Sequence, residues 1–315
     1  MSAVFCKPIE NYAEIFNTLV KNTAQYITDN NLKCMILGIS GGIDSTVVAA
    51  ICHEVSKKTD IPLIGRSLPT KFNKEGEITT AGLVGKAFCT NYQKVSIEQT
   101  YKTLSNDLYG YECALDFNEP QPTALTNGNI QARLRMIYLY NLAGMYKGIV
   151  IDTDNLTENN LGYFTIHGDV GDFNPIGGLW KTEVFELAKY LHEHYSIESH
   201  FNETYRDQLK PNSDYSRCVA VSESLKLKPT AGLGITNSDL EELEAESYDQ
   251  VDAILQEILA WKSMIKESSW NLKNFLDDQQ FLNIPYKVVE AVATRHFASE
   301  FKRKQLPIKI TRHEL

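Results

Sequence analysis

The feature that most constrains this chain is an apolar run that leads straight into a glycine turn and then into a helix. Residues 34–39 are almost continuously apolar, which is typical of a strand buried on both faces of a parallel sheet. The turn Ser40-Gly41-Gly42 follows at once, and a helical pattern occupies 44–58. Because such units build parallel sheets with helices on both faces, the chain is predicted to be an α/β protein.

The alternation of strand and helix continues along the chain. Strands are predicted at 61–64, 92–97 and 147–151, and helices at 10–30, 77–88, 129–146, 182–192 and 238–266. Residues 105–127 are predicted to form a long loop, because Asn, Pro, Gly and Thr are frequent there. These elements predict a doubly wound parallel sheet flanked by helices. Ligands of such sheets lie beyond the carboxyl ends of the strands, so residues after Ile39 and Ile151 should face one site.

Composition excludes several classes of protein. The chain has 315 residues, which allows one large domain or two small ones, and its formal net charge of −9 disfavours a general nucleic-acid binder. The N-terminus lacks the pattern of a secretory signal, and no apolar run approaches the ~20 residues that span a bilayer. The cysteines are scattered without a C-x-x-C pair, which indicates reduced thiols in a cytoplasmic protein: Cys6, Cys34, Cys52, Cys89, Cys113 and Cys218.

The strongest local motif is the turn at 40–45, Ser-Gly-Gly-Ile-Asp-Ser, called here the 40–45 loop. Gly41 and Gly42 permit close backbone approach, Ser40 and Ser45 add hydroxyl donors, and the next helix begins with free amide groups. These features predict a phosphate site. Asp44 would repel phosphate unless a divalent cation bridges the two. The alternative is an ordinary strand–helix turn with a capping side chain.

The segment T-D-N-L-T-E at 153–158 directly follows the fourth predicted strand. Topology places it beside the 40–45 loop, so Glu158 is a candidate second carboxylate for Mg²⁺. The alternative is a solvated loop that caps a helix.

Two further segments have an open interpretation. The glycine-rich stretch 168–181 is either a tight loop near a ligand or a set of turns, and it contains Asp169, Asp172 and Lys181. In the helix at 129–146, the predicted apolar face contains Ile130, Leu134, Ile137 and Leu142. Arg133 and Arg135 are two residues apart and cannot share a helix face, so one can meet a ligand anion while the other is structural; both can also be surface charges.

Taken in order, these segments resemble NAD synthetase, the ammonia-dependent type, in the N-type ATP pyrophosphatase superfamily. The 40–45 loop resembles S-G-G-x-D-S, and 129–136 resembles N-[IV]-[KQ]-A-R-x-R-M. Residues 153–169 are similar to T-D-N-x-x-E, G-F-F-T and G-D, continued by Pro175 and Lys181. Residues 229–233 and 238–243 are similar to P-[ST]-A-G-L and T-D-E-x-E-L.

The resemblance implies a fold, a reaction and a set of partners. The fold would be adenine nucleotide alpha hydrolase-like: a single domain over 1–315, with its core at 30–260 and a helical segment and basic tail at 261–315. The reaction would be the ATP-dependent amidation of deamido-NAD through an adenylate, releasing AMP and pyrophosphate. The length leaves no room for an amidase domain, so ammonia is the expected donor unless a separate glutaminase subunit docks. The protein would be a cytoplasmic homodimer with its dinucleotide site near the subunit interface.

The resemblance also assigns roles to single residues. Mg²⁺ would be bound by Asp44 and Glu158. The residues implied for ATP are Gly38, Ser40, Gly41, Gly42, Asp44, Ser45, Arg66, Thr153 and Lys181. Those implied for deamido-NAD are Asn129, Arg133, Asp169, Asp172 and Lys181. The residues implied for catalysis are Asp44, Lys181, Thr153 and Asp169.

The chain also departs from the family pattern. Ser67 stands where the family often has Arg, with Arg66 one place earlier, while Leu240 and Phe301 replace a Glu and a His. Two alternatives stay open: another adenylating enzyme of the superfamily, or a nucleotide-binding homologue without catalysis. The acidic charge disfavours a tRNA enzyme, and the combination of Asp44 with Glu158 disfavours a mere binder.

Overall fold

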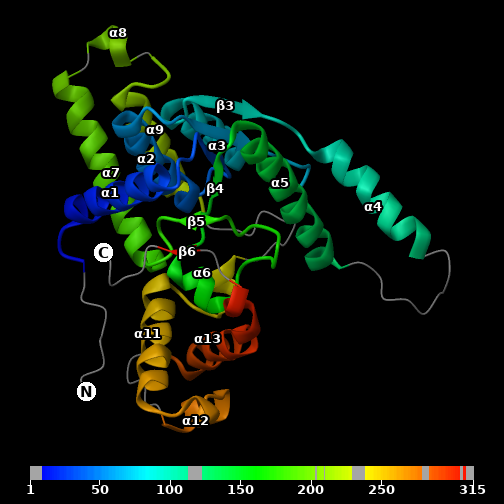
Figure 1. Ribbon diagram of the computed structural model, residues 1–315. Helices are drawn as coiled ribbons and strands as arrows, with labels where there is room; N and C mark the ends of the chain where they lie inside the picture. The colour runs from blue at the N-terminus through cyan, green and yellow to red at the C-terminus, as the bar shows by residue number, and fades with distance from the viewer. Residues whose placement is uncertain are drawn as a thin grey trace.

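A parallel six-stranded sheet crosses the middle of the molecule in the order β3-β2-β1-β4-β5-β6 (Figure 1). The computed structural model describes residues 9–112, 123–202, 204–208, 210–228, 238–278, 284–305 and 308–309. The strands are β1 Met35–Gly38, β2 Leu63–Ser67, β3 Asn91–Lys94, β4 Ile149–Ile151, β5 Phe173–Asn174 and β6 Ile308–Lys309. Every neighbouring pair of these strands is parallel, so the predicted doubly wound parallel sheet is confirmed.

Helices cover both faces of the sheet, and β1 shows why. Met35 and Leu37 contribute to one apolar cluster and Ile36 to another, so the strand is buried on both faces. The first face is covered by α1 Tyr12–Asp29, α2 Ile43–Thr59, α3 Glu75–Phe88, α7 Lys181–Asn202 and α9 Asp214–Lys226, with the short α8 Tyr205–Gln208 after α7. The opposite face is covered by α4 Glu98–Glu112 and α5 Ala124–Tyr146.

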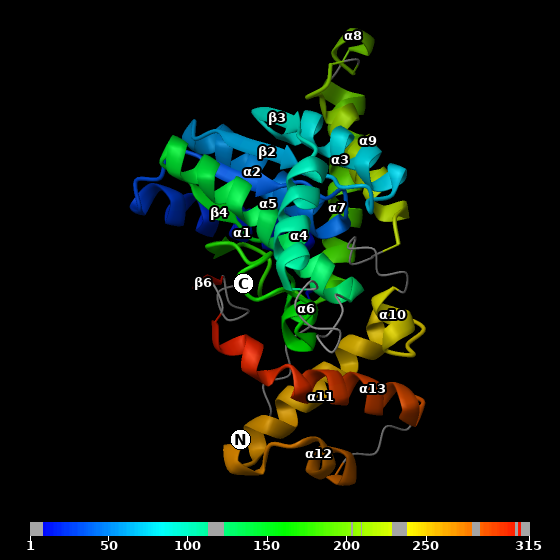
Figure 2. The same cartoon turned by 90° about the vertical axis from the view of Figure 1, so that its right-hand side faces the viewer.

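A third group of helices lies beyond one edge of this core and has its own apolar cluster (Figure 2). Its elements are α6 Leu156–Leu161, α10 Asp239–Glu242, α11 Tyr248–Met264, η1 Glu267–Ser269, α12 Leu272–Asp278, α13 Tyr286–Ala298 and η2 Glu300–Gln305. Within it, Leu161 of α6 packs in the same cluster as Ile254 and Val292. The C-terminal helices are therefore fastened to the element that follows β4, and this places them beside the carboxyl edge of the sheet.

The predicted loop at 105–127 is wrong at both of its ends. α4 continues to Glu112 and α5 begins at Ala124, while 113–122 lie outside the described residues. Tyr101 and Leu104 of α4 contribute to the cluster that includes α5, which stabilises the helix. The residues that suggested a loop most strongly, Pro120 and Pro122, come after the end of α4.

The predicted acidic helix at 238–266 is in fact two helices. α10 ends at Glu242 and α11 begins at Tyr248, and between them Glu244 has a φ of +52°. Leu243 is buried at the break, so the turn between the helices directs an apolar side chain into the C-terminal cluster. α7 differs in the other direction, since it continues ten residues past the predicted end at 192.

α5 is not apolar on one face only. Leu134 and Leu142 are buried as predicted, but Ile137 is 65% exposed, so its predicted place on the inner face is wrong. Tyr140 and Met145 are exposed as well. The helix therefore presents apolar side chains both to the sheet and away from it.

Cys34, Cys52, Cys89 and Cys218 are free thiols, while Cys6 and Cys113 lie outside the described residues. Among the helices that the structure describes, none combines the length and the apolar character needed to cross a membrane.

Candidate active site

A cavity of about 830 Å³ opens at the carboxyl edge of the sheet, where the topology predicted a site. Its lining combines the 40–45 loop, the residues after β2 and β4, the start of α5, the loop after α6 and the segment around α13 and η2. The predicted site residues that line it are Gly38, Ser40, Gly42, Asp44, Ser45, Arg66, Asn129, Thr153, Glu158, Asp169 and Lys181. Gly41, Arg133 and Asp172 are not part of the lining.

The 40–45 loop presents amide groups to this cavity. Gly42 is the N-cap of α2 and offers no side chain to bond the first amide groups of the helix. Ser40 Oγ lies 3.0 Å from Ser45 Oγ and accepts a hydrogen bond from the Gly42 amide at 3.2 Å, which holds the turn closed. A helix N-terminus in this state favours an anion.

Gly41 explains why the turn needs glycine. Its φ is +91°, and a Cβ there would lie 2.4 Å from the carbonyl oxygen of Glu77 and 2.9 Å from the amide of Ala81. The role of Gly41 is thus close packing against α3, which frees its neighbours to face the cavity.

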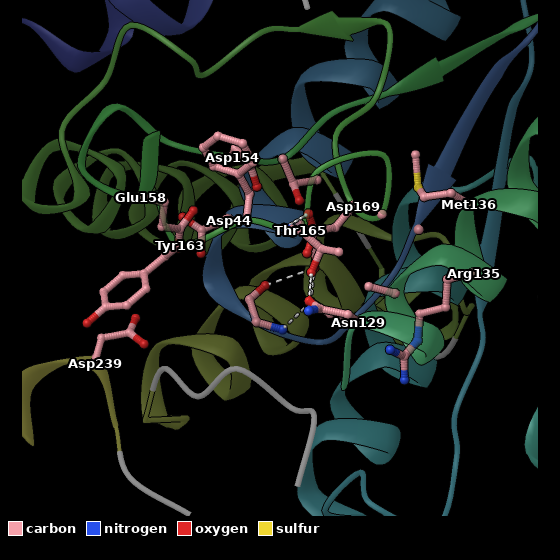
Figure 3. Close-up of a pocket in the computed structure, with 18 of the residues that line it drawn as sticks. Asp44, Asn129, Arg135, Met136, Asp154, Glu158, Tyr163, Thr165, Asp169 and Asp239 are labelled. Atoms are coloured by element: carbon pink, nitrogen blue, oxygen red, sulfur yellow. Dashed lines mark hydrogen bonds between the residues drawn. The ribbon is translucent and has the colours of Figure 1, made fainter. Parts of the chain in front are cut away.

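Asp44 and Glu158 converge on the ammonium group of Lys181 (Figure 3 labels both carboxylates). Lys181 Nζ lies 2.5 Å from Asp44 Oδ2 and 3.0 Å from Glu158 Oε1. The lysine side chain is only 2% exposed. Sequence positions 44, 158 and 181 are thereby brought into one charged cluster by the ends of β1 and β4 and the start of α7.

Burial determines how these groups hold their protons. Burial first, and then the negative charge of Asp44, raise the pKa of Glu158 to about 8. Burial alone would lower the pKa of Lys181, but the two carboxylates raise it well above its usual value. The lysine is therefore a permanent cation between its partners.

Asn155 organises the two carboxylates, and sequence reasoning did not include it among the site residues. It caps α6 by accepting from the Glu158 amide, and its own amide donates to Glu158 Oε2 at 3.1 Å. Its Nδ2 donates to Asp44 Oδ1 at 2.8 Å. The spacing Asn-x-x-Glu is a capping-box pattern, and this was the signal available in the sequence.

The donor set fits Mg²⁺ only in part. Among the residues that the structure describes, no three His, Cys, Asp or Glu side chains are grouped as metal ligands. Mg²⁺ commonly takes one or two carboxylates and completes its shell with water and substrate phosphates. Asp44 belongs to the 40–45 loop, and it shares Lys181 with Glu158, so the residues present fit a metal that arrives with phosphates.

The loop after α6 contributes a further carboxyl group to the cavity, that of Asp169. The amide of Thr165 donates to Asp169 Oδ1 at 2.6 Å, and Thr165 Oγ1 donates to Asn129 Oδ1 at 2.8 Å, as Figure 3 shows. Burial raises the pKa of Asp169 to about 7, against the hydrogen bond from Thr165 that lowers it. This carboxyl group can gain or lose a proton near neutral pH.

The structure separates the two arginines of α5. Arg135 lines the cavity and donates to the Leu68 carbonyl and to Asn73, each at 3.1 Å. Arg133 donates to the Ile166 carbonyl at 3.2 Å from outside the cavity lining. Asp172, also outside, accepts a hydrogen bond from the Tyr140 hydroxyl at 2.7 Å.

Arg66, which stands one place before the position of the family arginine, is buried at the end of β2. Its guanidinium donates to the Gly65 carbonyl and to the Asn91 side chain, at 2.7 and 2.9 Å. Ser67 and Phe301, two of the departures from the family pattern, both line the cavity. The motif at 229–233 lies outside the described residues.

The C-terminal segment bonds to the backbone at the end of α6, in a set of contacts called here the carbonyl clamp. Its donors are Arg295 to Leu161, His296 and Arg303 to Asn160, and Lys302 to Gly162 and Phe164, all at 2.7–3.0 Å. Positive groups at a helix C-terminus satisfy free carbonyl groups and complement the helix dipole. The basic character of this segment thus has a structural role, and the fixed helix is the one that holds Glu158.

The family model described as NAD synthase matches residues 15–306. The NH₃-dependent NAD⁺ synthetase of Methanocaldococcus jannaschii is 30% identical over 248 residues, which cover 78% of this chain and 82% of that protein. The NH₃-dependent NAD⁺ synthetase of Thermococcus sibiricus is 32% identical over 299 residues, which cover 95% of this chain and 97% of that protein.

Solved structures are similar as well. The NMN synthetase of Francisella tularensis superposes with a TM-score of 0.68 at 26% identity, covering 95% of this chain and 99% of that one. The NH₃-dependent NAD synthetase of Campylobacter jejuni shares the fold, with a TM-score of 0.61 at 21% identity over 95% of this chain and 98% of that one.

Proposed function

This chain belongs to the NAD synthase family, and from that premise we infer how its cavity carries out the family reaction. The reaction is the ATP-dependent amidation of deamido-NAD to NAD, so the protein is a ligase. Ammonia fits as the nitrogen donor, because a relative matched over 95% of this chain is described as NH₃-dependent. The observation that supports the use of ATP most directly is the Asp44–Lys181–Glu158 cluster beside the helix N-terminus.

The first step joins two anions. A carboxylate oxygen of the pyridine ring bonds to the α-phosphorus of ATP, and pyrophosphate leaves. We propose that the amide groups of the 40–45 loop and the ammonium of Lys181 bind the phosphates, with Gly38, Arg66 and Thr153 beside the nucleotide. Asp44 and Glu158 would hold Mg²⁺, which when bound offsets the negative charge of the triphosphate.

The second step needs a proton acceptor. The ammonia nitrogen bonds to the carbonyl carbon of the adenylate, AMP leaves, and the nitrogen must then lose a proton. Asp169 is the proposed acceptor, because its pKa of about 7 lets it take a proton near neutral pH. Asn129 and Thr165, which are bonded to each other beside it, would position the pyridine end of the substrate.

The proposed assembly is a homodimer that meets along α5. Ile137 and Tyr140 are exposed on the outer side of this helix, where a second copy would cover them. Arg133 and Asp172, both implied for deamido-NAD, lie outside the cavity, and Asp172 is bonded to Tyr140. A dinucleotide that extends from the cavity toward this side would explain both observations.

The substitution Ile137→Asp tests this interface. We expect a monomer by light scattering and a large loss of amidation, because a charge replaces an apolar contact. Ile197→Asp is the matched control, since Ile197 is 55% exposed on α7, a helix that covers the face of the sheet opposite to α5. A dimeric Ile137→Asp variant would exclude α5 as the interface.

We further propose that residues 1–315 act as one functional unit in the cytoplasm. The C-terminal helices complete the cavity, because Arg295, Phe301 and Lys302 line it together with the 40–45 loop. The free thiols at the described cysteines agree with a reducing compartment.

The test of the reaction is a chromatographic assay. The protein with ATP, Mg²⁺, deamido-NAD and ammonium should form NAD and AMP in equal amounts, and glutamine should replace ammonium poorly. NAD formation from glutamine at a comparable rate would require an amidase partner. If neither NAD nor AMP forms, the chain is instead a sister enzyme of the superfamily or a catalytically silent binder.

Nicotinic acid mononucleotide is the second candidate substrate, because the similar structure from Francisella tularensis is described as NMN synthetase. The same assay should therefore compare the two acids at equal concentration. The larger kcat/KM identifies the substrate. A preference for the mononucleotide would remove the need for a dinucleotide site that reaches the outer side of α5.

A further inference from the structure

The ammonium group of Lys181 occupies the space between the two carboxylates proposed to hold Mg²⁺. It lies 2.5 Å from Asp44 Oδ2 and 3.0 Å from Glu158 Oε1, and its side chain is almost fully buried. The ring of Tyr248 lies 5.8 Å from the same nitrogen. A buried ammonium in contact with two carboxyl groups is strongly held, because little water reaches it to replace these partners.

The other oxygen of each carboxylate is bonded to Asn155. Asp44 Oδ1 accepts from Asn155 Nδ2 at 2.8 Å, and Glu158 Oε2 accepts from the Asn155 amide at 3.1 Å. The oxygens on the lysine side bond to Nζ instead. A divalent cation held by the same two carboxylates would compete with the ammonium for them, and two positive charges close together repel strongly.

We propose that Lys181 holds the two carboxylates in the absence of metal, and that its side chain moves from them toward the phosphates when the metal binds with its nucleotide. This inference rests on the proposed function, because it takes Asp44 and Glu158 as the metal ligands. Free divalent metal then binds poorly before the nucleotide. When metal and nucleotide bind, one cation replaces another beside Asp44 and Glu158, so that the two carboxylates always face a positive charge.

Hydrogen bonds hold the backbone of Lys181 in place, so the movement belongs to its side chain. The backbone amide of Lys181, the first residue of α7, donates to Thr157 Oγ1 at 2.8 Å, and Thr157 is bonded in turn to Asp252. Lys181 lines the cavity, so its flexible four-carbon chain can turn into the space beside the 40–45 loop. There the displaced ammonium would contact the phosphates. Their negative charge takes the place of the two carboxylates as its partner.

The test is a Mn²⁺ titration of the full-length protein without nucleotide, with free Mn²⁺ measured by electron paramagnetic resonance. Lys181→Met removes the ammonium and retains the apolar stem. We expect this variant to bind one Mn²⁺ roughly tenfold or more tightly than the wild type. Lys181→Arg keeps a cation and should bind as weakly as the wild type. Adding Asp44→Asn to Lys181→Met should abolish the gain, which locates the ion.

Thermal unfolding provides a second measurement. Lys181→Met should melt below the wild type without metal, since two buried carboxylates then face each other. MgCl₂ should raise the melting temperature of the variant and leave that of the wild type nearly unchanged. If Lys181→Met cannot be isolated, Lys181→Gln replaces it, because a neutral amide can still donate to both carboxylates.

A neutral variant that binds Mn²⁺ no more tightly than the wild type would overturn the inference. The outcome is separable from that of the proposed function, because the titration contains no substrate. Amidation by the wild type without a gain of Mn²⁺ affinity in the variant would refute only the lysine exchange. A gain of affinity in a protein that does not amidate deamido-NAD would refute only the proposed function.

Discussion

The cavity has two walls that use charge in opposite ways. One wall is the 40–45 loop with the first turns of α2 and α6, where amide groups and charged side chains face the cavity. The other wall is the segment of α13 and η2, whose cations are bonded to carbonyl groups at the end of α6. A basic residue beside the cavity is thus not by itself a phosphate ligand, because its bonds decide whether it faces substrate or backbone.

The largest effect is expected on the first wall. Asp44→Asn should lower turnover by roughly 10²–10³ or more, since it removes a metal ligand and a partner of Lys181. The measurement is steady-state NAD formation with saturating ATP and Mg²⁺. Asp107→Asn, at an exposed position on α4, is the matched control and should keep full activity. Full Mg²⁺-dependent activity in Asp44→Asn would refute the assignment of Asp44.

A smaller effect is expected on the second wall. Arg303→Met removes donors to the Asn160 carbonyl and to Glu300, and should lower the free energy of unfolding by about 1–3 kcal/mol. Turnover should fall less than in Asp44→Asn, because Arg303 does not line the cavity and acts only through the residues that it holds. Denaturant unfolding with parallel kinetics measures both.

Lys287→Met is the control for that comparison, since Lys287 is 65% exposed on α13 and forms a surface ion pair with Glu244. Its stability should change by no more than about 0.5 kcal/mol. Equal losses in the two variants would mean that the carbonyl clamp has no special role.

The smallest expected effect is a pH dependence of folding stability, which arises from His296 in the second wall. Burial first, and then the charges of Arg303 and Lys262, lower the pKa of His296 from 6.5 to about 3. Below pH 6.5 the unfolded chain therefore binds a proton that the folded protein does not. The contribution of His296 to stability is complete above pH 6.5 and is lost progressively as the pH falls toward 3.

The measurement is the melting temperature of wild type and His296→Gln between pH 8 and pH 5. Burial raises the pKa of Asp252 to about 6, so this group adds stability as the pH falls below 6 and opposes the histidine. Its effect is common to both proteins and cancels in the comparison. We expect the wild type to lose stability more steeply than His296→Gln, and parallel curves would contradict the burial argument.

The sheet was predictable because its strands have a local signature. The apolar run that becomes β1 is buried on both faces, and the helix predicted at 44–58 buries its apolar residues Val47, Val48, Ile51 and Val55. The errors fell where local composition is a weak guide. α4 is stabilised by the packing of Tyr101 in the cluster that includes α5, and the break at Leu243 depends on burial in the C-terminal cluster.

The site was predictable to the level of residue type. Most of the predicted residues line one cavity, because the ends of parallel strands share an edge. Their roles stay proposals until the variants are measured. The sequence did not separate Arg133 from Arg135 by function, and it did not single out Asn155, since both distinctions depend on which neighbours surround the side chain.

The sequence by itself determined the alternation of strands and helices and the glycine turn of the 40–45 loop. It also showed that Asp44, Glu158 and Lys181 lie in three separate motifs of the chain. Only the tertiary structure decided that Lys181 stands between Asp44 and Glu158, and that the basic C-terminal segment bonds to the end of α6. Apolar patterning and glycine turns act over a few residues, so they are visible in the sequence. The carbonyl clamp joins residues 134–143 positions apart, and only packing of the whole chain brings them together.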